Sequence, residues 1–137
     1  MSLAEVSAAV PDPIISVEGL SKAFTGTQAL TGVSFKVPRG AFFGCFGPNG
    51  AGKSTLLRIL TGQLEPTSGG ALVLGFAPGK DTVPLKRNVG IVPESESPPS
   101  FLTGLEYLEF VCRLRGLADG EVRIEKWLDY FDMADKK

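Results

Sequence analysis

The run Gly47–Thr55, with the letters GPNGAGKST, limits what this chain can fold into more than any other feature. It has the spacing G-x-x-x-x-G-K-[ST] of a phosphate-binding loop. It follows the apolar run Ala41–Phe46 and overlaps the helix-favouring run Ser54–Thr61, which Gly62 ends. Strand, glycine-rich loop and helix is the arrangement that this motif requires. We therefore predict a nucleotide phosphate site rather than a turn that only joins a strand to a helix.

Each residue type in the loop has a physical reason to be there. Glycines let the backbone curl so that successive N–H groups point at an anion, and the N-terminus of the following helix adds a positive field. Lys53 supplies a mobile positive charge for the β- and γ-phosphates, and the Ser54 hydroxyl is suited to bind Mg²⁺. The residues predicted to bind the phosphates are Asn49, Gly50, Ala51, Gly52, Lys53, Ser54 and Thr55.

Composition excludes several other functions. The 137 residues carry 14 Lys and Arg against 15 Asp and Glu, and this net charge of −1 at pH 7 makes nucleic acid an unexpected partner. There is no histidine, which excludes imidazole chemistry and histidine-ligated metal from this stretch. Cys45 and Cys112 lie in apolar runs and are expected to be buried free thiols. No run reaches the roughly 18 apolar residues that span a bilayer, and residues 1–13 are expected to be a flexible leader without the basic start of a secretory signal.

Apolar patterning predicts a mixed α/β core over residues 14–97. Alternating apolar and polar residues at Val33–Val37 indicate a half-exposed strand of an antiparallel sheet. The other expected strands are Ile14–Val17, Ala41–Phe46, Ala71–Phe76 and Val89–Val92, with a turn at 65–70 and a loop at 77–84.

A polar, proline-rich segment then precedes residues 98–137, which are expected to begin a helical subdomain. Thr103 and Glu106 have the spacing of a capping box, and Gly116 is placed to end the helix that they begin. A second helix is expected over residues 120–130. Its incompletely buried apolar face is expected to consist of Val122, Ile124, Trp127, Leu128 and Phe131. The predicted fold is therefore α/β and truncated within the helical part.

With these motifs in place, the chain resembles the ATP-binding subunits of ABC transporters, in particular the export type of bacteria, from about Ile14 to Phe131. The resemblance rests on the loop sequence GPNGAGKSTL, on the segments VEGLSKAF and ALTGVSF before it, which are similar to the family's first hairpin, and on LTGLEYLEF after it. It implies a P-loop NTPase core with an antiparallel β subdomain and the start of a helical subdomain. It also implies ATP and Mg²⁺ as cofactors.

Two further site residues follow from the resemblance. Phe24 stands where the family has an aromatic ring that stacks on adenine, whereas the sequence pattern alone favours a core aromatic. Glu94 stands at the Q-loop position, where the family has a glutamine that reaches Mg²⁺ and the attacking water. A carboxylate is also a good Mg²⁺ ligand. The alternative for Glu94 is a solvated loop glutamate.

The resemblance also implies partners and a location. Two ATP-binding subunits would enclose ATP between them and drive separate membrane-spanning subunits from the cytoplasmic face of the membrane. The family's signature motif, Walker B aspartate, adjacent glutamate and H-loop histidine do not occur in this sequence, so no complete catalytic set is predicted. The alternatives are a nucleotide-binding module that does not hydrolyse ATP and a soluble ABC-type ATPase without a transport partner. A P-loop kinase or GTPase fits less well because of the hairpin before the loop.

Overall fold

The structure is a computed structural model that describes residues 12–92, 99–133 and 135. The chain divides into two compact units, Met1–Ile91 and Val92–Lys137, and each unit is described by itself. The predicted boundary after residue 97 falls at a segment outside the described residues, as does most of the predicted leader, so both stay predictions. No helix in the described ranges is both long enough and apolar enough to cross a membrane.

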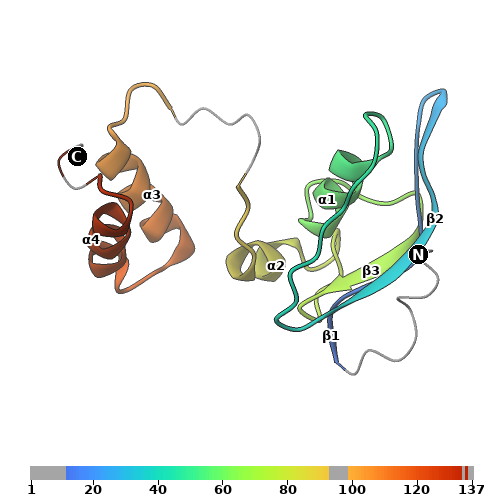
Figure 1. The fold of residues 1–137 in the computed structure, drawn as a ribbon, viewed down its shortest axis with the longest axis horizontal. Helices are drawn as coiled ribbons and strands as arrows, with labels where there is room; N and C mark the ends of the chain where they lie inside the picture. The colour runs from blue at the N-terminus through green and yellow to red at the C-terminus, as the bar shows by residue number, and fades with distance from the viewer. Residues whose placement is uncertain (1–11, 93–98, 134, 136–137) are drawn as a thin grey trace. The chain divides into compact units, whose positions relative to one another are not determined.

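A three-stranded antiparallel sheet organises the described part of the first unit (Figure 1). The strands are β1 (Pro13–Phe24), β2 (Thr27–Pro38) and β3 (Ser68–Val73), and their order in the sheet is β2-β1-β3. The predicted hairpin is confirmed, since β1 and β2 pair closely up to Phe24 and Thr27 on either side of a short turn.

An irregular register in β1 explains how its core face is built. Val17 and Leu20 are both buried although they are three residues apart, a spacing that would place them on opposite faces of a regular strand. The register shifts between these two residues, and Gly19 has a φ of 58°, which a glycine adopts at little cost. The bulge therefore turns both side chains toward the core.

The helix α1 (Lys53–Leu60) packs against β2 and β3, and the short helix α2 (Thr82–Asn88) contributes to the same hydrophobic core (Figure 1). Ile59 of α1 and Leu85 of α2 are both fully buried in the same hydrophobic cluster as the sheet. The predicted helix after the phosphate loop is confirmed. The loop predicted over 77–84 is wrong in its last residues, because Leu85 anchors a short helix that begins at Thr82.

Two predicted strands are absent from the described residues. Ala41–Phe46 and Val89–Val92 do not pair with any described strand. An apolar run of this kind needs neighbours on both sides to become a buried strand, and the sheet here offers none. Phe42 and Cys45 are consequently exposed. Cys112 is partly buried, so the expectation of buried thiols is wrong for Cys45 and met only in part for Cys112. Both cysteines are free thiols, as expected.

The second unit contains two helices, α3 (Gly104–Arg115) and α4 (Gly120–Tyr130). Both predicted helices are confirmed. Of the predicted apolar face of α4, Ile124 and Leu128 are buried, whereas Val122, Trp127 and Phe131 are exposed. Trp127 instead stacks with Phe131 at a centroid distance of 6.0 Å.

Candidate functional site

The loop between residue 46 and α1 is closed by its own lysine. The ammonium of Lys53 donates to the carbonyl oxygens of Gly47 and Pro48, both at 2.7 Å. The amide of Ala51 also donates to the Pro48 carbonyl, at 3.3 Å. A lysine ammonium has three N–H donors, so two bonds to the loop leave one for a ligand. The loop is thus folded around a positive charge.

Gly52 joins this loop to the sheet. Its φ of 86° lies in the left-handed region, where side chains are disfavoured. A Cβ added here would collide with the carbonyl oxygen of Ala29 and would lie 2.7 Å from the Leu30 side chain. Only glycine lets the end of the loop approach β2 this closely. The sequence motif predicts a glycine at this position, and the structure shows that β2 imposes the same requirement.

The N-terminus of α1 is available to an anion. Gly52 is the N-cap residue and makes no side-chain capping bond, and the first turn contains no acidic residue. The partial positive charge of the helix end is therefore not offset by a neighbouring side chain of that turn. Ser54 and Thr55 lie in this turn, directly after Lys53.

The predicted phosphate-binding residues therefore form one continuous segment. Asn49, Gly50 and Ala51 are exposed on the loop, Gly52 ends it, and Lys53, Ser54 and Thr55 begin the helix. They run consecutively from the loop into the first turn of α1, and the Lys53 ammonium is bonded back to the start of the loop. What each residue binds stays a prediction. That the Gly47 and Pro48 carbonyls accept from Lys53 could not be predicted from the sequence, because the motif leaves the loop conformation open.

Phe24 lies at the end of β1 beside the hairpin turn. Its side chain is 47% exposed, so it is not the core aromatic that the sequence pattern alone favours. The Lys22 ammonium lies 5.2 Å from the centroid of the Phe24 ring. Lys22 pairs with Leu30 across the sheet, and Leu30 is one of the residues that confine Gly52. One strand pair therefore connects the ring to the loop.

Metal ligands are sparse in the described residues. No group of three or more histidine, cysteine, aspartate or glutamate side chains gathers there. Glu94, one of the two predicted Mg²⁺ ligands, lies outside the described residues, and Ser54 lies within them. A hydroxyl alone does not hold Mg²⁺, but Mg²⁺ commonly takes one or two protein ligands and completes its shell with phosphate oxygens and water.

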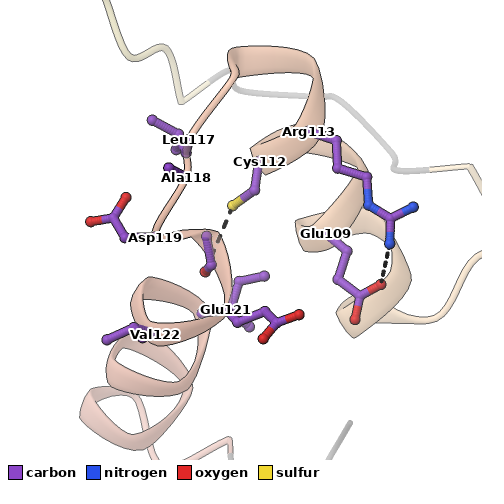
Figure 2. Close-up of a pocket in the computed structure, with 10 residues that line it drawn as sticks. Glu109, Cys112, Arg113, Leu117, Ala118, Asp119, Glu121 and Val122 are labelled. Atoms are coloured by element: carbon purple, nitrogen blue, oxygen red, sulfur yellow. Dashed lines mark hydrogen bonds and ion pairs between the residues drawn. The ribbon is translucent and has the colours of Figure 1, made fainter.

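The second unit has a hollow of about 330 Å³ between α3 and α4 (Figure 2). Two ion pairs involve its lining residues: Glu109 meets Arg113 at 3.7 Å, and Asp119 accepts from Arg123 at 2.8 Å, which lowers the pKa of Asp119. The Cys112 side chain points toward the start of α4, with its sulfur 4.0 Å from the Gly120 carbonyl. Three acidic residues, Glu109, Asp119 and Glu121, line this hollow against a single arginine, Arg113, which disfavours an anionic ligand such as a phosphate chain. We therefore place the functional site at the loop.

The sequence is similar to known proteins over most of its length. The sequence model described as ABC transporter matches residues 30–137. The linearmycin resistance ATP-binding protein LnrL of Bacillus subtilis is 34% identical over 125 residues, which cover 90% of this chain and 40% of that protein. The chain thus spans about two fifths of the length of such curated relatives.

Solved structures of ATP-binding subunits and cassettes also match the chain. The structure of an ATP-binding subunit of an ABC transporter has a TM-score of 0.81 and 29% identity, over 90% of this chain and 52% of that one. A dimeric ATP-binding cassette in a post-hydrolysis state, bound to ADP and Pi, has a TM-score of 0.72 and 26% identity, over 88% of this chain and 57% of that one. These neighbours confirm the predicted α/β fold of the P-loop NTPase type.

Proposed function

The chain belongs to the ABC transporter family, and on this premise we propose that it is an ATP-binding subunit that binds MgATP at Gly47–Thr55. The observation that carries the proposal is the closed loop, in which Lys53 is held by two carbonyls at 2.7 Å next to an uncapped helix N-terminus. A phosphate chain is the ligand that matches a cradle of backbone amides with one lysine at its centre.

The polar residues of the cradle take separate tasks in this proposal. Lys53 keeps its bonds to the loop and directs its third N–H donor at a β- or γ-phosphate oxygen. The amides at the start of α1 donate to the same phosphates, because no side chain of the first turn competes for them. The Ser54 hydroxyl is a ligand of Mg²⁺, and the bound ion offsets the negative charge of the phosphates.

The base is proposed to stack on Phe24. The ring is half exposed at the end of β1 and therefore accessible to a planar ligand. Stacking of a base on an aromatic side chain is worth about 1–3 kcal/mol. A phenyl ring offers no hydrogen bond, so it favours a purine in general rather than adenine over guanine.

Transport is the wider role that we propose. LnrL is described as a resistance ATP-binding protein, which supports an export-type subunit that powers separate membrane-spanning partners from the cytoplasmic face of the membrane. The neighbour solved as a dimer with ADP and Pi supports a second ATP-binding subunit and ATPase activity of the assembly. Glu94 is proposed to position water or Mg²⁺ from the Q-loop.

ATP binding without hydrolysis is a second candidate for this stretch. The observation in its favour is that the 137 residues contain neither a signature motif nor a Walker B aspartate with its adjacent glutamate. Phosphoryl transfer needs a group that orients the water and a clamp on the transferred phosphate. Measuring ATP binding and phosphate release on the same sample distinguishes the ATP-hydrolysing subunit from the module that only binds ATP.

Isothermal titration of the chain with ATP and MgCl₂ tests the proposed function. We expect saturable binding that Lys53→Ala weakens strongly. Binding of equal strength in the Lys53→Ala variant would contradict the assigned site. Phosphate release above the buffer rate would then favour the hydrolytic candidate, and its absence would favour the binding module.

A further inference from the structure

Lys22 covers one face of the Phe24 ring. Its ammonium lies 5.2 Å from the ring centroid, within the range of a cation–π interaction. We propose that Lys22 is a positioning residue of the nucleotide site: it occupies one face of Phe24, fixes the orientation of the ring and leaves the opposite face for the base. This inference rests on the proposed function, since it requires that Phe24 stacks on a base.

The ring is the partner that the structure gives to the Lys22 ammonium. Within the described ranges, no carboxylate lies at ion-pair distance from Lys22. Lys22 is partly buried, and without an acidic partner the face of the aromatic ring is the attraction that remains for its charge. The contact therefore orders two side chains that are otherwise mobile at the end of a hairpin.

Part of the residue stays accessible in this arrangement. Phe24 keeps 47% of its surface exposed even with the ammonium in place. In the proposed arrangement, the face opposite Lys22 accepts a single stacked base. Fixing the ring beforehand lowers the ordering cost that a mobile ring would add to base binding.

The position in the sheet connects this pair to the phosphate cradle. Lys22 lies opposite Leu30 in the β1–β2 register, and the Leu30 side chain confines Gly52 at the end of the loop. The platform for the base and the cradle for the phosphates thus share one strand pair. A ligand that reaches both must contain a base and a phosphate chain, which describes a nucleoside triphosphate.

The test compares ATP with inorganic tripolyphosphate, which carries phosphates but no base. Lys22→Met removes the charge and keeps most of the stem, whereas Lys22→Arg keeps a cation that stacks on aromatic rings. Lys126→Met is the matched control, because Lys126 lies 5.7 Å from the Trp127 centroid in the other unit and its loss changes the net charge equally. Phe24→Leu and the double variant Lys22→Met/Phe24→Leu complete a cycle.

We expect Lys22→Met to weaken ATP binding about two- to five-fold, the size of an exposed cation–π contact, and to leave tripolyphosphate binding unchanged. Lys22→Arg should retain the affinity of the parent chain, and Lys126→Met should have no effect. In the Phe24→Leu background, Lys22→Met should weaken ATP binding no further. Thermal unfolding of each variant, followed by circular dichroism, checks that the sheet is intact.

Several results would overturn the inference. The first is that Lys22→Met binds ATP as tightly as the parent chain or more tightly, while Phe24→Leu binds ATP more weakly. The role of Lys22 would then be wrong, and the proposed function would stand. Another is an equal loss for tripolyphosphate, which would assign Lys22 to general charge attraction. If the parent chain binds neither ATP nor tripolyphosphate, the proposed function fails as well, and the two failures are thereby distinguished.

Discussion

The side chain of Lys53 donates to the backbone of Gly47, with Nζ and the carbonyl oxygen 2.7 Å apart. This hydrogen bond joins two ends of the loop that are six residues apart in sequence. The lysine therefore shapes the loop as well as carrying its charge. Its loss should affect both the position of the backbone amides and the attraction for phosphate.

Replacing Lys53 with alanine should weaken ATP binding roughly 10- to 100-fold, since a hydrogen bond to a charged group contributes about 1.5–3 kcal/mol. Titration with ATP in the presence of MgCl₂ measures the change. Lys80→Ala, at an exposed lysine of the same unit, is the control and should leave the affinity unchanged. A comparable loss in both variants would mean that net charge, and not the loop, determines the affinity.

Gly52→Ala should destabilise the first unit more than Gly40→Ala. Both glycines have positive φ, at 86° and 75°, which costs an alanine about 1–2 kcal/mol. The added methyl meets the backbone of Ala29 at Gly52 but open space at Gly40, so that only Gly52→Ala adds a clash. Urea unfolding of the two variants measures the difference. Equal losses would show that the loop end is free to move away from β2.

Gly120→Ala and Gly104→Ala should change stability in opposite directions. Each glycine is the first residue of a helix, α4 and α3 respectively. A Cβ on Gly120 would lie 2.8 Å from the Cys112 Cβ, which predicts a loss of about 1–3 kcal/mol from overpacking. Gly104 faces open space, and its replacement should stabilise by about 0.4–1 kcal/mol. Thermal unfolding measures both, and a stabilising Gly120→Ala would refute the close packing of α3 on α4.

The capping box of α3 should make the second unit sensitive to acid. The backbone N–H of Thr103 donates to Glu106 at 2.7 Å, and this bond, with that of the Thr103 hydroxyl, lowers the pKa of Glu106 below its usual 4.5. A lowered pKa in the folded state gives stability that is complete above the unfolded value and is lost as the pH falls through the folded value.

Glu106→Gln keeps a hydrogen-bonding side chain in the box but removes this titration. The thermal midpoint of the variant should therefore fall less than that of the parent chain between pH 6 and about pH 3. Thr103→Ser, which retains the hydroxyl, should keep the acid dependence of the parent chain. Identical acid curves for Glu106→Gln and the parent would show that the titration of Glu106 does not contribute to the acid dependence of stability.

How well the sequence predicts an element depends on where its determinants lie. Helix α3 is predicted correctly because Thr103, Glu106 and Gly116 act within the helix and its caps, and the structure contains both bonds of the box and a left-handed Gly116. The strand predicted at Ala41–Phe46 is wrong because a strand depends on partners elsewhere in the chain. An apolar run indicates that a segment tends to be buried, but it does not indicate whether a neighbouring strand is present to pair with it.

The candidate site also combines features that are local in the sequence with features that depend on the fold. The spacing of Gly47, Gly52 and Lys53 identifies the loop from the sequence alone, since the motif is local. The contact of Lys22 with Phe24 and the confinement of Gly52 by Ala29 depend on the register between strands and on the fold of the loop against them. Neither can be read from spacing. Glu94 stays a prediction because it lies outside the described residues.

The strand order β2-β1-β3 has a consequence for synthesis of the chain. Of these three strands, the middle one, β1, leaves the ribosome first. The strand β2 can pair with it at once because only a short turn separates them. The other edge of β1 must wait for β3, which begins at Ser68, 44 positions after β1 ends at Phe24. During that interval the emerging polypeptide presents a half-paired strand, followed by its phosphate loop, to the chaperones that meet it.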